Sequence, residues 1–145
     1  MIDWGDVASE IDAQGWAILP GLINSGEAAA VAGLYGRDNL FRTRVVMARH
    51  GFGRGEYKYF SYPLPPLVQE LRANLYPPLA EIANRWQARL ARPARFPAEH
   101  AGYLERCHGA GQTRPTPLLL RYGPGDYNCL HQDLYGEEVF PLQVA

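Results

Sequence analysis

The stretch RYGPGDYNCLHQD, residues 121–133, decides how the rest of the sequence is interpreted. Its centre, GPGD at residues 123–126, has Pro at the second position and Gly at the third, as a type II turn requires. The residues on either side, 118–122 and 127–133, are rich in apolar and aromatic side chains. We therefore predict two strands joined by a tight turn.

His131 and Asp133 lie two positions apart in the second of these predicted strands. Residues i and i+2 of a strand project from the same face, with Cα atoms about 6.5 to 7 Å apart. An imidazole nitrogen and a carboxylate oxygen can then converge on one metal ion, and a third ligand from elsewhere would complete a facial site of the kind that binds iron(II). Taken alone, the triplet His-x-Asp is a weak signal of metal binding, because it arises often by chance.

The same stretch resembles the beginning of the double-stranded β-helix of iron(II)- and 2-oxoglutarate-dependent oxygenases. It is most similar to the AlkB-type nucleic-acid dealkylases, whose pattern Arg-Tyr-x-Pro-Gly-x-x-x-x-Leu-His-Gln-Asp is met at every fixed position. The continuation, residues 134–145, is also similar to a bacterial branch described as oxygenases that act on damaged DNA.

The resemblance implies a set of functional residues and a reaction. His131 and Asp133 would bind Fe(II), and Tyr122 would line the pocket for 2-oxoglutarate. The implied reaction is oxidative dealkylation of damaged nucleic acid, a form of DNA repair. Prolyl-hydroxylase-type members share a looser form of the motif, so hydroxylation of a prolyl or another amino-acid side chain is the alternative within enzymes.

Two features of that family have no counterpart in the sequence. The third ligand of the family is a His on a later strand, but none of the four histidines follows Asp133. The basic residue that holds the far carboxylate of 2-oxoglutarate also lies downstream, and no Arg or Lys follows Arg121. A jelly roll needs roughly 80 residues, whereas 29 remain from Pro117 onward. We therefore expect a truncated and inactive piece of an oxygenase; a remnant or binding module is the alternative outside enzymes.

The fold that we predict is α+β, in a single domain over residues 1–145. N-terminal helices would pack on the first strands of an incomplete, cupin-like double-stranded β-helix, with residues 1–116 mainly helical and 117–145 as the start of the jelly-roll core. Periodicity and end signals predict helices over 3–13, 24–34 and 98–108, a helical hairpin with arms 67–76 and 77–90, and strands over 16–19, 44–48 and 138–145.

A basic and aromatic stretch, residues 42–62, stands where AlkB-type enzymes carry a substrate lid. Residues 37–58 contain six basic and two acidic side chains, a net charge of +4, interleaved with aromatic residues. Cations that neutralise phosphate and rings that stack on bases are typical of single-strand binding. We expect Arg49, Arg54 and Tyr57 to contact damaged single-stranded DNA or RNA; a solvated loop beside a tyrosine-rich core edge is the alternative.

Whole-chain properties limit the function classes further. The net charge is −1, with 14 basic and 15 acidic residues, so global attraction to polyanions is excluded and only a local patch remains. No apolar run reaches the roughly 18 to 20 residues of a membrane span, and the acidic N-terminus lacks the features of a secretory signal. We expect a cytoplasmic protein with no membrane partner, in which Cys107 and Cys129 remain free thiols.

Overall fold

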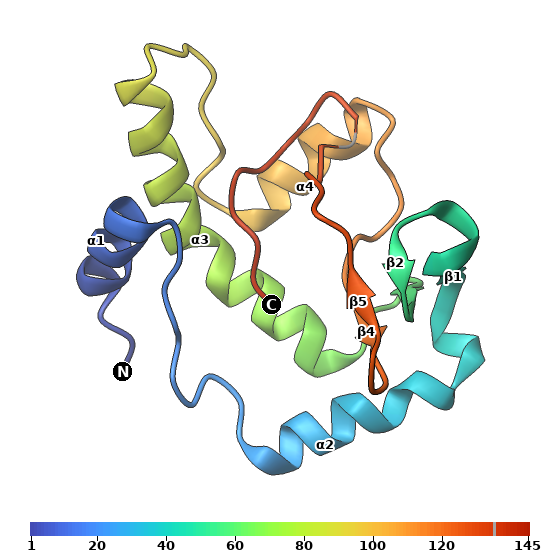
Figure 1. Cartoon of the computed structure of the whole chain (residues 1–145). Coiled ribbons are helices and arrows are strands. Elements are labelled where there is room, and N and C mark those ends of the chain that lie inside the picture. Colours follow the sequence, from blue (N-terminus) through green and yellow to red (C-terminus); the bar gives the residue numbers. More distant parts are fainter. Residues whose placement is uncertain (135) are drawn as a thin grey trace.

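The computed structural model describes residues 1–134 and 136–145. Figure 1 shows α1, α3 and α4 on one side of the molecule and the strands on the other. The mixed α+β class is confirmed, whereas the jelly-roll architecture stays a prediction. The elements are the helices α1 (Trp4–Gln14), α2 (Ser25–Gly33), α3 (Pro66–Arg89) and α4 (His100–Gly109), the short 3-10 helices η1 (Leu34–Gly36), η2 (Asp38–Leu40) and η3 (Met47–His50), and the strands β1 (Phe41–Val46), β2 (Gly53–Arg54), β3 (Glu56–Phe60), β4 (Leu118–Arg121) and β5 (Tyr127–Asn128).

The strands form two antiparallel ladders. In the larger sheet, the order is β1-β3-β4, so β3 is central and β4 lies at an edge. The second ladder pairs β2 with β5. Strand β1 overlaps the strand that we predicted over 44–48, whereas β2 and β3 add further strands to residues 1–116, which we expected to be mainly helical. The reason is the alternation in β3, which buries Glu56, Lys58 and Phe60 on one face and leaves the two tyrosines between them half-buried on the other.

Glycines allow β2 and β5 to approach closely. Gly53 has φ +122°, and a Cβ atom at this position would lie 2.2 Å from the carbonyl oxygen of Tyr127. Gly53 and Arg54, which lie within the predicted lid 42–62, pair with β5. The turn before β5 is as predicted: Gly125 has φ +79°, and the Asp126 N–H donates to the Gly123 carbonyl over 3.0 Å.

Helix α3 corrects the predicted helical hairpin. It runs as one helix of 24 residues through Pro77 and Pro78, and Figure 1 shows its axis changing direction about midway. Each proline removes one backbone hydrogen bond, which bends a helix. The apolar face nevertheless continues through the prolines, since Leu75, Leu79 and Ile82 are all buried. Continuous burial explains why the chain bends here and does not turn back.

Near the N-terminus, the helices agree with the sequence and the expected strand does not. Asn24 and Glu27 form the predicted capping box at the start of α2. Residues 16–19 belong to no strand. Trp16 and Ile18 are 57% and 66% exposed, so this segment lacks the burial that would support the expected strand.

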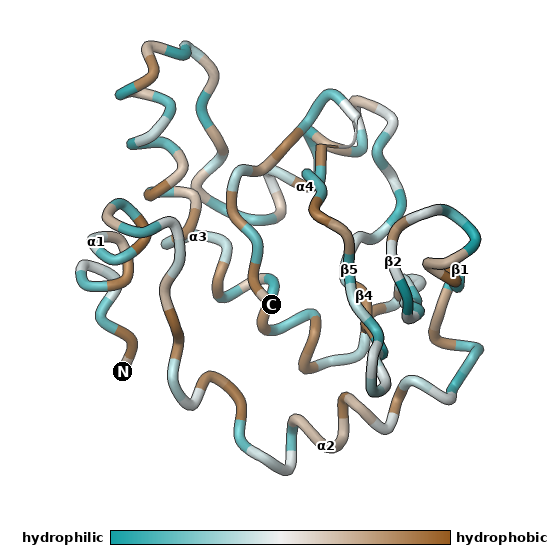
Figure 2. Tube along the Cα trace, in the orientation of Figure 1, coloured by the Kyte–Doolittle hydropathy of each residue, from teal (hydrophilic) through white to brown (hydrophobic). Residues whose placement is uncertain are grey.

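The core lies between the helices and includes the C-terminal segment. Val7, Ala8 and Ile11 of α1 pack against α3, and apolar positions recur along both helices (Figure 2). Phe140 packs on this cluster and on a second one beside α4. The strands expected over residues 129–133 and 138–145 are absent from the described residues, and Tyr135 lies outside them. Packing of Phe140 on helices replaces strand pairing here.

Candidate functional site

His131 and Asp133 lie together although no strand holds them. The His131 Nε2 and Asp133 Oδ1 atoms are 3.5 Å apart. Two ligands of one metal ion at right angles, each about 2.1 Å from it, lie about 3 Å apart. An imidazole nitrogen and a carboxylate oxygen at this separation therefore fit two adjacent positions around a metal such as iron. Their side chains are 47% and 34% exposed, which leaves the donor atoms accessible.

Hydrogen bonds on both sides orient this pair. The His131 Nδ1 atom lies 2.8 Å from the carbonyl oxygen of Cys129. Because a carbonyl only accepts, Nδ1 donates this hydrogen bond, and Nε2 is the ring nitrogen that faces Asp133. On the other side, the Gln143 amide donates to Asp133 Oδ2. Sequence reasoning missed Gln143, because nothing in its local pattern indicates a contact ten residues away.

Within residues 1–134 and 136–145, no third metal donor is found beside the pair. No group of three or more His, Cys, Asp or Glu side chains in the described part of the chain could hold a metal ion. His100 packs against Tyr76 in the core, with ring centroids 5.3 Å apart, and His50 stacks on Phe52 at 5.2 Å. The metal role of His131 and Asp133 stays a prediction.

Tyr122 lines a shallow depression at the end of β4, with a volume of about 510 Å³. Its ring lies against Gly55, where a Cβ atom would be 2.8 Å from the ring. Gly55 has φ +128°, so both its conformation and the close approach exclude a side chain at this position. The other residues that line the depression are Glu56, Arg121, Gly123 and Asp126.

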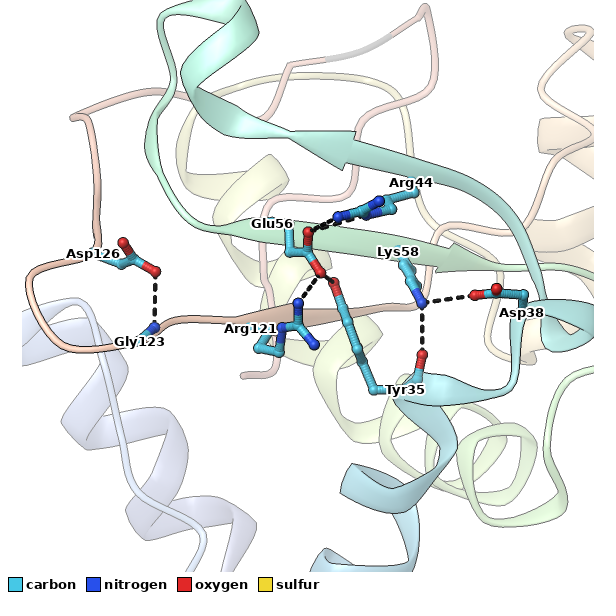
Figure 3. Close-up of polar contacts among 8 residues, drawn as sticks. All are labelled: Tyr35, Asp38, Arg44, Glu56, Lys58, Arg121, Gly123 and Asp126. Carbon is cyan, nitrogen blue, oxygen red and sulfur yellow. Dashed lines mark hydrogen bonds and ion pairs between the residues drawn. The ribbon is translucent and has the colours of Figure 1, made fainter.

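Glu56, which lines this depression, is the centre of a charged cluster (Figure 3). Its side chain is only 12% exposed and forms ion pairs with Arg44 and Arg121. It also accepts a hydrogen bond from the Tyr35 hydroxyl over 3.0 Å. The hydrogen bond from Arg44 holds the pKa of Glu56 below its usual value. Burial, with a further contribution from Glu56, raises the pKa of Tyr35 to about 12.

Lys58 extends the cluster along the same face of β3 (Figure 3). Its Nζ atom donates to the Tyr35 carbonyl over 2.7 Å and to Asp38 over 2.9 Å, and it lies 4.3 Å from the centre of the Tyr35 ring. The hydrogen bond from Lys58 lowers the pKa of Asp38. Much of the positive charge of residues 37–58 is therefore used within the fold.

The expected substrate-contacting residues are divided between two positions. Arg49, in η3, and Arg54, in β2, are exposed. The guanidinium of Arg54 lies 3.7 Å from Asp126. Tyr57 is half-buried in the central strand β3 and packs edge-on against Tyr59. The stretch 42–62 thus belongs largely to the sheet. Its tip, residues 48–54, has the exposed position expected of a lid, except that Gly53 is buried.

Comparisons with known proteins give one family. The model of an oxygenase family, described as catalysing oxidative methylation of damaged DNA, matches residues 55–145, which include Tyr122, His131 and Asp133. Among the described residues, no helix is long and apolar enough to span a membrane. No solved structure matches the chain.

Two curated relatives come from Mycobacterium tuberculosis, and their printed names call both uncharacterized. One is from strain CDC 1551 / Oshkosh and the other from strain ATCC 25618 / H37Rv. Each is 53% identical to the chain over 86 residues, which are 59% of this chain and 37% of the relative. The chain therefore matches little more than a third of the length of these relatives.

Proposed function

The chain belongs to this family of oxygenases described as acting on damaged DNA, and on that premise we propose that it carries part of the site of an iron(II)- and 2-oxoglutarate-dependent oxygenase that dealkylates damaged nucleic acid. The observation that carries the proposal is the convergence of His131 Nε2 and Asp133 Oδ1 at 3.5 Å, inside the matched residues. The first strands of a double-stranded β-helix are part of the same proposal.

In the proposed site, His131 and Asp133 would hold the metal. The metal with 2-oxoglutarate supplies the oxidation of a C–H bond in the substrate. The chain itself contributes by orienting the two side chains that would bind the metal. The carbonyl of Cys129 accepts a hydrogen bond from His131 Nδ1, so Nε2 is the ring nitrogen that is directed toward the proposed metal position.

We assign 2-oxoglutarate to the depression beside Tyr122. A phenol hydroxyl can donate a hydrogen bond to a carboxylate, and Arg121 lines the same depression. Glu56 carries one negative charge but pairs with two guanidinium groups, those of Arg44 and Arg121. Asp126, which also lines the depression, lies 3.7 Å from the guanidinium of Arg54. These two carboxylates and three guanidinium groups carry one net positive charge, which favours an anionic co-substrate.

Arg49 and Arg54 are the residues that we propose for contacts to the phosphates of the substrate. Both are exposed, and they flank Phe52, whose side chain is 44% exposed. The Cys129 N–H donates to the Phe52 carbonyl over 2.9 Å, which ties this tip of the sheet to the segment that carries His131. Nucleic acid held at the tip would therefore lie on the segment that leads to the metal.

The reaction is tested in a chimera, because the chain matches 37% of the relatives' length. The 86 matching residues of a Mycobacterium tuberculosis relative are replaced by those of this chain. With Fe(II), 2-oxoglutarate and a methylated single-stranded oligonucleotide, we expect release of succinate and formaldehyde, and we expect His131→Ala and Asp133→Ala to reduce both to background. Turnover with a prolyl peptide alone would indicate an amino-acid hydroxylase; no turnover would indicate a non-catalytic module.

Binding is tested on the chain itself with a fluorescent single-stranded oligonucleotide. We expect Arg49→Glu and Arg54→Glu each to weaken binding and to lower the slope of log affinity against log salt by about 1 for each lost phosphate contact. Arg85→Glu, an exposed arginine of α3, is the matched control. Equal effects of all three variants would remove the tip from the proposed site.

A further inference from the structure

We propose that Gln143 is the positioning residue for Asp133, selecting which carboxylate oxygen faces the metal; this inference rests on the proposed function. The Gln143 Nε2 atom donates to Asp133 Oδ2 over 2.5 Å. The other oxygen, Oδ1, is the one that lies 3.5 Å from His131 Nε2. The amide thus occupies one carboxylate oxygen and leaves its partner for the ion.

The carboxylate needs such a contact because the surrounding fold does little to fix it. Asp133 is exposed and belongs to no helix or strand, so its two oxygens could exchange by rotation of the side chain. A ligand that must bind at about 2.0 to 2.2 Å loses affinity when it has to be oriented during binding. A hydrogen bond to the oxygen that does not face the metal removes that cost in advance.

Gln143 can act in this way because the chain before it is anchored. Phe140 lies in an aromatic cluster, with its ring centroid 5.0 Å from that of Phe96 and 5.7 Å from that of Tyr103. Leu142, the immediate neighbour of Gln143, packs on the core between α1 and α3. The position of the amide is therefore set by the apolar contacts of two partly buried neighbours and not by the exposed segment itself.

A second anchor lies two residues before Phe140. Glu138 forms an ion pair with Arg106 of α4 at 2.9 Å. The Gln112 side-chain amide donates to the Glu138 carbonyl over 3.1 Å and accepts from its N–H over 2.9 Å. Residues 138–142 are thus held by polar and apolar contacts together, and Gln143 follows directly.

The pair is consequently held from two independent sides. His131 is oriented by the Cys129 carbonyl, and Cys129 is hydrogen-bonded to Phe52 at the tip of the sheet. Asp133 is oriented by Gln143, which the helical core places. Removing the amide should therefore loosen the carboxylate while the imidazole keeps its tautomer.

The contact is tested first without metal, on the 145-residue chain. In ¹H–¹⁵N spectra, we expect the side-chain amide resonances of Gln143 to shift when Asp133→Ala removes the acceptor. The side-chain amide of Gln69, an exposed residue of α3, is the matched reference and should not move. Unchanged Gln143 resonances would overturn the inference.

The positioning role is tested with Mn²⁺ alone, followed by paramagnetic broadening of the resonances near His131. Gln143→Met keeps the length of the side chain but removes the donor, and we expect it to weaken the apparent Mn²⁺ affinity about 10- to 100-fold. Gln69→Met should have no effect. An unchanged affinity in Gln143→Met, together with lost binding in His131→Ala, would overturn the inference and leave the proposed function standing. Equal broadening in wild type and His131→Ala would instead overturn the proposed function and, with it, this inference.

Discussion

The sheet β1-β3-β4 and the segment 129–145 place charged side chains in opposite ways. In the sheet, Glu56 is 12% exposed and is satisfied by two arginines and a tyrosine hydroxyl. In the segment, His131 and Asp133 are 47% and 34% exposed, and a few hydrogen bonds orient them. A buried charge with several partners stabilises a fold, whereas an exposed and oriented pair keeps its lone pairs for a ligand.

The largest loss of stability is expected at Gly53. This residue lies in the β2-β5 ladder, which pairs the strand just before β3 with the strand just before the segment 129–145. Gly53→Ala would combine an unfavourable φ of +122° with a Cβ atom 2.2 Å from the Tyr127 carbonyl. Strain and overpacking together should lower the free energy of unfolding by about 3 kcal/mol, measured by urea denaturation. Gly51→Ala is the matched control, because its φ is +70° with open space around it, and should cost about 1 kcal/mol. Equal losses would show that the β2-β5 ladder does not hold the segment.

Glu56→Gln tests the buried side of the comparison. The substitution keeps the shape of the side chain but leaves Arg44 and Arg121 without their shared carboxylate. We expect the free energy of unfolding to fall by about 2 kcal/mol, seen as a lower urea midpoint with an unchanged slope. Glu70→Gln, at an exposed position of α3, should stay within about 0.5 kcal/mol of wild type. A Glu56 variant as stable as this control would contradict the role of the cluster.

Acid should weaken the same cluster. The pKa of folded Glu56 lies below its ordinary value of 4.5, so the stabilisation is present above that value and is lost as the pH falls through the folded pKa. Asp12 and Asp38 also have lowered pKa values. The wild-type protein and the Glu56→Gln variant should therefore both lose stability in acid. The difference in unfolding free energy between wild type and Glu56→Gln should narrow below about pH 4.5. A difference that is constant down to pH 2.5 would contradict this assignment.

The smallest effect on stability is expected at the exposed pair. His131→Ala and Asp133→Ala should each change the free energy of unfolding by less than about 0.5 kcal/mol, because both side chains are substantially exposed. In the chimera, the same substitutions should remove turnover. Thermal unfolding of the variants checks the first part. A large loss of stability would mean that the pair serves the fold and not a ligand.

Local signals predicted much of the structure. The turn at residues 123–126 and the capping box of Asn24 follow from the conformational needs of a few adjacent residues. The proximity of His131 and Asp133 needs only their spacing, and it survives although the expected strand is absent.

Contacts between distant segments could not be predicted in this way. Continuous burial along α3 carries the helix through Pro77 and Pro78, where the sequence indicated a break. Gln143 meets Asp133 only because Phe140 packs between helices. Tertiary packing determines both the continuous helix and the Gln143 contact, and a local sequence pattern does not contain this information.

The edge position of β4 has a consequence for handling the protein in solution. Leu120, the last of the three leucines of this strand, is 48% exposed, and β4 has a neighbour, β3, on one side only in the described sheet. An apolar strand with an open edge invites strand addition from another molecule and, at high concentration, aggregation. A charged substitution such as Leu120→Lys would therefore be a first choice for obtaining soluble material.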